Sequence, residues 1–212
     1  MSKFQKTAII LGVVYFVFRL TGFLSDIFWE TDWGNKEDFI PYIIKNIFFL
    51  IANATSIALL FVFNALHHKS TVAKTAAIIG GVWWLLYVCA TITRLVGHYL
   101  RYIDDFPYTE ISFIFNLSGS IRLIAAIILI ITVGFFADSH RKNKAILISS
   151  IALIALSLFS GLFSYFRWYF IDQYCFSTIS YSVISHTIAA LVTLATCSLF
   201  ICAATIKSKK IA

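Results

Sequence analysis

Charged residues are scarce in this chain. Lys, Arg, Asp and Glu together make up 13% of its 212 residues, and hydrophobic residues make up 60%. Soluble domains average about 25% charged residues. An apolar excess of this size cannot be buried within a soluble fold of this length, so most of the chain is expected to lie in lipid. An ordinary soluble domain is thereby excluded.

Proline and glycine are also rare, with two and nine residues respectively. Pro41 and Pro107 fall in or beside predicted loops, so no proline interrupts the interior of a long apolar stretch. Carriers that work by alternating access often use helices that are broken at Gly or Pro. The scarcity of both residues lowers the expectation of such a carrier without excluding one.

Cysteine and histidine form no catalytic or metal-binding pattern. The four cysteines include no CxxC pair, and only Cys175 falls in a predicted loop, where it has no partner for a disulfide. His67 and His68 are adjacent and diverge on a helix, and the other histidines fall in different segments. Nucleophile motifs, phosphate loops and paired intramembrane carboxylates are missing. We expect no metal, no cofactor and no enzymatic activity.

Six long apolar stretches fill most of the chain. Each has about 20 residues or more, which lets a helix cross a hydrocarbon core of roughly 30 Å. The pattern predicts an all-α integral membrane protein with six transmembrane helices in three consecutive hairpins. We expect one domain over residues 1–212, with hairpin units at 6–70, 74–142 and 144–210. The predicted spans are Thr7–Phe28, Phe39–Leu66, Thr75–Val96, Ile111–Ala137, Ala145–Phe166 and Tyr181–Ile206.

The three hairpins begin alike, with a lysine before a run of Ala and Ile at Lys6, Lys74 and Lys144. A threefold internal repeat is one interpretation of these starts. The other is that evenly spaced hairpins under a single charge rule resemble one another. The local matches are short, so the second interpretation is preferred and the first stays open.

The loops at the two ends of the spans differ in charge. Nine of the ten acidic residues lie in or beside the first, third and fifth loops, and Asp138 alone lies on the other side. That other side carries ten of the 17 Lys and Arg, which the positive-inside rule assigns to the cytoplasm. Both termini are then cytoplasmic, and the net charge of +7 needs no nucleic-acid partner. We expect a multi-pass protein of the cytoplasmic (inner) membrane. In a eukaryote, Lys209 and Lys210 would resemble a retrieval signal for the endoplasmic reticulum membrane.

Two arginines fall near the middle of predicted spans. At 1.5 Å per residue, Arg19 lies about 18 Å from the inner boundary and Arg122 about 17 Å from the outer one. A central arginine is costly in lipid and normally faces the bundle interior. One interpretation is an anion-attracting vestibule or ligand site; the other is that each arginine snorkels or pairs with a polar neighbour. The candidates for a ligand or ion pathway are Arg19, Lys45, Asn53, Arg94, Asn116, Arg122 and His186.

The leading functional hypothesis is a non-enzymatic sensor, anchor or interaction subunit of a membrane complex. Such a subunit is expected to contact the lipid bilayer, to form homo-oligomers and to bind a cytoplasmic partner protein on its basic face. The alternative is a small transporter or channel subunit for an anionic or aromatic solute, which uses Arg19 and Arg122. The candidates for partner docking are Lys69, Lys74, Arg141, Lys142 and Lys144.

Overall fold

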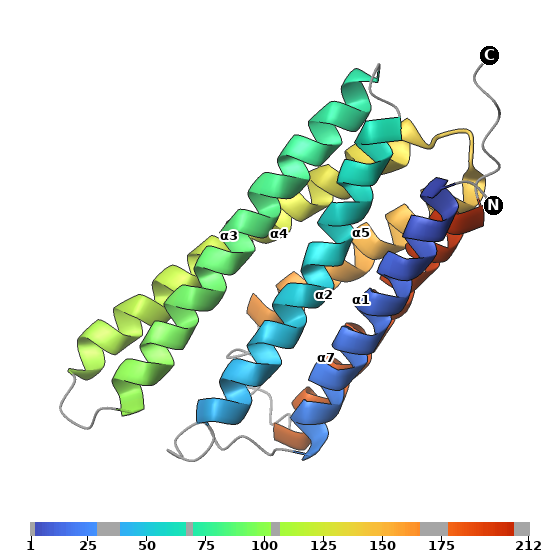
Figure 1. Cartoon of the computed structure of the whole chain (residues 1–212). Coiled ribbons are helices and arrows are strands. Elements are labelled where there is room, and N and C mark those ends of the chain that lie inside the picture. Colours follow the sequence, from blue (N-terminus) through green and yellow to red (C-terminus); the bar gives the residue numbers. More distant parts are fainter. Residues whose placement is uncertain (1–2, 29–38, 67–69, 103–106, 166–177, 206–212) are drawn as a thin grey trace.

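The computed structural model describes residues 3–28, 39–66, 70–102, 107–165 and 178–205. Within these ranges the chain is all-helical (Figure 1). The helices are α1 (Lys3–Phe28), α2 (Phe39–Leu66), α3 (Thr71–Tyr102), α4 (Tyr108–Ser139), α5 (Lys144–Tyr165) and α7 (Thr178–Thr205). The predicted fold class of an all-α membrane protein is confirmed at this coarse level.

The residues that precede three of these helices explain where the helices begin. The Ser70 hydroxyl accepts a hydrogen bond from the Ala73 amide at 3.2 Å, one turn into α3. The Asn143 side chain accepts from the amide of Ala145 at 3.2 Å, at the start of α5. Pro107 precedes α4, where its missing N–H costs no helical hydrogen bond. The Ser70 and Asn143 side chains satisfy amides that the first turn of a helix leaves unpaired.

The predicted and observed boundaries of the helices agree to within a few residues, with α3 as the exception. It extends four residues before and six residues beyond the predicted range of 75–96, up to Tyr102. The added outer turn carries His98 and Arg101. Hydropathy marks where a chain is apolar, whereas a helix continues through polar residues once it has left the hydrocarbon core.

In the described part of the chain, five helices are long and apolar enough to cross a membrane: α1, α2, α3, α4 and α7. In α5 the apolar helical segment is shorter and covers Lys144–Ser160 within the described residues. The outward-facing side chains are apolar; Ile78, Phe113 and Ile148, for example, are 66–67% exposed. A surface of this kind is typical of helices that contact lipid. The count of six spans and their orientation stay predictions.

The helices form a closed ring in which each contacts the next. Contacts join α1 to α2, α2 to α3, α3 to α4, α4 to α5, α5 to α7, and α7 back to α1. α3 and α4 make one side of the bundle, and α1 and α7 make the other (Figure 1). We call the end where α1, α3 and α5 finish the outer end, following the predicted orientation, and the opposite end the inner end.

Small residues bring the helices of this ring together. Ala8, Ala52, Ala73, Ala90 and Ala203 are all completely buried. Without a hydrophobic driving force between helices in lipid, close backbone approach at such residues supplies the packing energy. The ring is therefore held by alanine contacts distributed over α1, α2, α3 and α7.

An aromatic cluster fills the inner end of the bundle. The ring of Phe63 on α2 lies 5.8 Å from that of Phe136 on α4 and 4.2 Å from that of His140, measured between centroids. The ring of Phe4 on α1 also packs against that of Phe63, with centroids 6.3 Å apart. These rings join three helices and close the inner side of the bundle interior.

Candidate functional site

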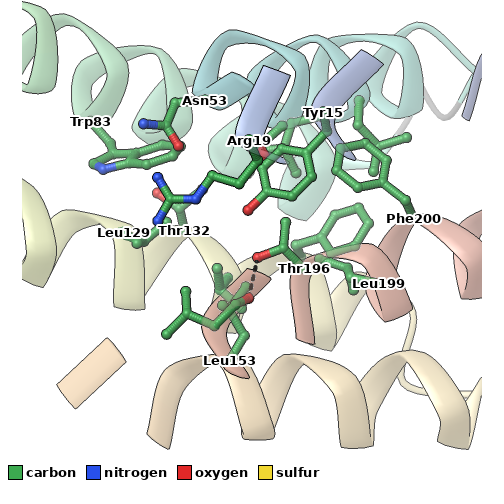
Figure 2. A pocket seen from close by; sticks show the side chains of 16 residues that line it. Tyr15, Arg19, Asn53, Trp83, Leu129, Thr132, Leu153, Thr196, Leu199 and Phe200 are labelled. Atoms are coloured by element: carbon green, nitrogen blue, oxygen red, sulfur yellow. Dashed lines mark hydrogen bonds between the residues drawn. The ribbon is translucent and has the colours of Figure 1, made fainter. Parts of the chain in front are cut away.

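A cavity of about 100 Å³ lies inside the ring, at the middle of the bundle. All six helices contribute side chains to its wall (Figure 2). Most of the lining is apolar, with Trp83, Leu129, Phe136, Leu153 and Phe200 among the larger side chains. The polar lining consists of Tyr15, Arg19, Asn53, Ser56, Thr132 and Thr196.

Arg19 supplies the charge of this cavity. Its Nε atom donates a hydrogen bond to the Thr193 hydroxyl on α7 at 3.3 Å, and the Thr193 hydroxyl donates to the Ala189 carbonyl at 2.8 Å. The guanidinium carbon also lies 4.5 Å from the centroid of the Phe49 ring, within the range of a cation–π interaction. Arg19 is thus held on one edge by α7 and on one face by α2.

The Phe49 ring reaches Arg19 because α1 has a glycine one turn further on. A Cβ atom at Gly22 would lie 2.5 Å from Cε1 of Phe49, which is far inside van der Waals contact. Any larger residue at this position would displace the ring on which the guanidinium rests. Gly22 therefore positions Arg19 through Phe49.

The end of the guanidinium that carries the two terminal nitrogen atoms points into the cavity. In Figure 2 it extends between Asn53 and Thr132, beside Trp83. Nε is satisfied by Thr193, and the terminal N–H groups make no hydrogen bond to protein in the described part of the chain. Arginine presents these donors in a planar fork that matches a carboxylate. The fork is therefore available for an anionic ligand.

The remaining polar groups complete a binding wall. The Thr132 and Thr196 hydroxyls donate to the carbonyls of Ile128 and Val192, at 2.7 and 2.9 Å, so they present only acceptors to the cavity, and the charged donors for an anion come from Arg19. Tyr15 is 4% exposed, and its ring packs on Phe200 at 5.5 Å. The wall thus combines hydroxyl groups and a guanidinium with aromatic and aliphatic surfaces.

Among the described residues, no carboxylate lines this cavity. The described residues also contain no group of three or more His, Cys, Asp or Glu side chains that could hold a metal ion. The positive charge of Arg19 is therefore offset only by a hydroxyl dipole and an aromatic ring within the described structure. The chemistry that this site supports is the recognition of an anion.

The structure brings some of the predicted pathway residues together and separates others. Arg19 and Asn53 meet in the cavity wall. Arg94 and Arg122 lie within electrostatic range of each other, nearer the outer end. His186 packs edge-on against Phe23 at 5.5 Å, on the outer part of α1 and α7. The other two are dispersed along α2 and α4, with Lys45 half-buried and Asn116 exposed.

The predicted docking residues lie on exposed surface wherever the structure describes them. Lys74 is exposed in the first turns of α3, and Arg141, Lys142 and Lys144 are exposed at the turn between α4 and α5. Lys69 lies outside the described residues. The described cations thus lie on two separate parts of the inner end, one near the start of α3 and one at the turn between α4 and α5.

Several cavity residues could not be identified from the sequence. Tyr15, Trp83 and Thr196 are residue types that membrane helices tolerate at little cost, so nothing marks them as functional. One pattern was available: Tyr15 lies four residues before Arg19, and residues at that spacing share a helix face. Arg19 is the residue of α1 that is most costly to place in lipid. A search for residues on the same helix face as Arg19 therefore identifies Tyr15.

Comparison of the chain with protein-family models, with curated proteins and with solved structures finds no match.

Proposed function

We propose that this chain binds a small organic monoanion in the Arg19 cavity and serves as a transporter or channel subunit for it. One observation carries the proposal. An arginine fork, with no carboxylate partner among the described residues, points into a cavity that all six helices line. Sites near the middle of the membrane, between helices, are typical of proteins that move solutes.

The energetics support a ligand rather than a purely structural role. A charged arginine at mid-depth costs at least roughly 2.5–3.5 kcal/mol on insertion scales. A cation–π contact with Phe49 and one bond to Thr193 offset part of that cost. A bound carboxylate would accept two charge-assisted hydrogen bonds from the fork. The site is therefore electrostatically completed by an anion.

The size of the cavity limits the ligand. An apolar cavity of roughly 150 Å³ is known to hold benzene, and one water occupies about 30 Å³ of liquid. A cavity of about 100 Å³ thus suits a ligand slightly smaller than benzene. A short-chain carboxylate matches both the polar and the apolar lining of the cavity. Its oxygens would face Arg19 and Asn53, and its alkyl chain would face leucine and phenylalanine side chains.

Propionate is expected to change the fluorescence of Trp83. Trp83 lines the cavity and lies beside the guanidinium of Arg19 (Figure 2), so a bound carboxylate alters the field at its indole ring. The measurement is a titration of the protein in lipid nanodiscs, with saturation expected for propionate. Propionamide, a neutral molecule of similar shape, is expected to give no saturable change.

The chain offers a matched control for this titration. Trp84 is the neighbouring residue and does not line the cavity. Trp83→Phe is expected to remove the response, and Trp84→Phe is expected to keep it. A response that survives Trp83→Phe, or one that propionamide reproduces, would count against an anion site at this cavity.

A path through the membrane requires the predicted topology of six spans with both termini inside. The lengths of five helices and the charge difference between the two ends support it. In a background in which all four cysteines are alanine, an impermeant maleimide added to intact cells should label a cysteine at Thr109 and spare one at Lys142. Both side chains are exposed, so burial does not explain a difference. Labelling at position 142 from outside would reverse the orientation.

Docking of a cytoplasmic partner protein is a second candidate function. The exposure of Arg141, Lys142 and Lys144 at one turn favours it, because surface charges of one sign attract an acidic partner. An association through this turn should weaken with salt, which screens exposed charges over about 8–10 Å. It should also weaken when all three residues are changed to Glu. If neither change affects the subunits that co-purify with the protein, this candidate fails.

A further inference from the structure

A second cluster of cationic and aromatic side chains lies toward the outer end of α2, α3 and α4. The guanidinium carbon of Arg94 lies 5.8 Å from the centroid of the Tyr42 ring. The same ring lies 4.3 Å from that of His98, which packs edge-on against Phe115 at 5.1 Å. Tyr42 is 8% exposed. The contact between its ring and Arg94 therefore lies inside the bundle rather than on the lipid surface.

Arg122 on α4 brings a further positive charge to this cluster. It lies close enough to interact electrostatically with Arg94 and His98. Its Nε atom is buried and has no hydrogen-bond partner in the part of the chain that the structure describes. The carboxylates of α4, Glu110 and Asp138, are about 18 and 24 Å away along the helix axis at 1.5 Å per residue, and α3 has none. Neither helix therefore supplies a counter-ion for Arg122.

Helical spacing places both arginines on the faces that line the Arg19 cavity. Arg122 precedes the lining residue Leu129 by seven residues, and Arg94 follows Trp83 by eleven. Both spacings return to within about 20° of the same helix face. They correspond to displacements of about 10 and 16 Å toward the outer end. The second cluster thus lies between the Arg19 cavity and the outer end of the bundle.

We propose that Arg94 and Arg122 hold a second small monoanion on the outer side of the Arg19 cavity, so that two anion sites follow one another through the bundle. Like charges repel strongly in an interior of low dielectric constant, and an anion between them turns the repulsion into attraction. Successive sites also let a charged solute enter without being trapped at one of them. The inference rests on the proposed function.

Equilibrium binding of radiolabelled propionate to the protein in nanodiscs tests this arrangement. The wild type is expected to saturate at two propionates per chain. Arg122→Gln is expected to bind one and to retain the Trp83 fluorescence response. At the propionate concentrations that saturate the wild type, Arg19→Leu is expected to bind one, with its Trp83 response shifted to higher propionate concentrations. Arg141→Gln, a matched change of an exposed arginine, should still bind two.

The outcomes separate the second site from the proposed function. Saturation of the wild type at one propionate, with none bound by Arg19→Leu, would overturn the second site and leave the Arg19 site standing. Two propionates bound by both Arg122→Gln and Arg94→Gln would overturn the assignment to these arginines. No binding by the wild type would refute both proposals. The retained Trp83 response shows that a variant is folded, and Arg94→Gln serves as the second variant if Arg122→Gln loses it.

Discussion

Arg19→Leu is expected to weaken propionate binding by about 10- to 150-fold, because a hydrogen bond to a charged group contributes roughly 1.5–3 kcal/mol. The affinity is read from the saturable Trp83 fluorescence response. Arg19→Lys should recover only part of the affinity, since a lysine keeps the charge and loses the planar fork. Arg141→Leu, which removes an exposed arginine at the inner end, should leave the affinity unchanged.

Stability distinguishes a binding role of Arg19 from a structural one. Removal of a charge from mid-depth relieves an insertion cost of at least roughly 2.5–3.5 kcal/mol, while the loss of the Thr193 and Phe49 contacts acts in the opposite direction. The midpoint of thermal unfolding in detergent is therefore expected to stay the same or to rise in Arg19→Leu. A large fall in that midpoint would indicate that Arg19 mainly holds α1 to α7.

Gly80→Leu is expected to lower the free energy of unfolding by about 1–3 kcal/mol, the usual cost of overpacking a filled interior. Gly80 lies where α3 packs against its two neighbours in the ring. A Cβ atom there would lie 2.7 Å from Cδ1 of Leu60, 3.2 Å from Cδ1 of Ile57 and 3.3 Å from Cγ2 of Thr132. The thermal unfolding midpoint in detergent measures the effect.

Gly134→Leu is the matched control for this substitution. A Cβ atom at Gly134 would meet nothing within 4 Å. Both variants replace a helical glycine, which by itself favours the helix by up to about 1 kcal/mol, so the difference between them reports packing alone. Equal midpoints for the two variants would mean that α3 can move away from α2 and α4 at little cost. Such an outcome would contradict the close packing at Gly80.

The sequence predicts the helices of this fold well and their arrangement poorly. Long apolar runs and polar connections place the helix ends to within a few residues, because hydropathy reports where lipid surrounds the chain. The ring could not be predicted, since an almost uniformly apolar helix such as α4 gives no indication of which face is inward. That choice depends on small residues such as Ala8 and Ala90, whose burial no hydropathy pattern reveals.

The residues of the site also fall into two groups, those that could be identified from the sequence and those that could not. Arg19 and Asn53 could be identified in advance, because a guanidinium or an amide in lipid is costly and needs a reason. Trp83 and Thr132 cost little in a membrane helix, and they became visible only when the helices were placed around one cavity. The proximity of Arg94 to Arg122 could not be predicted either, since it depends on how α3 turns against α4.

The closed ring has a consequence for how the protein is made. Every helix after α1 contacts the helix that precedes it among the described ones, so each can pack as soon as the ribosome has released it. The contact between α7 and α1 joins the last of the described helices to the first. A nascent chain that lacks α7 has an open groove where Thr193 would receive Arg19. Of the described helices, α7 is synthesised last, and it both completes the bundle and sets the position of the charge at its centre.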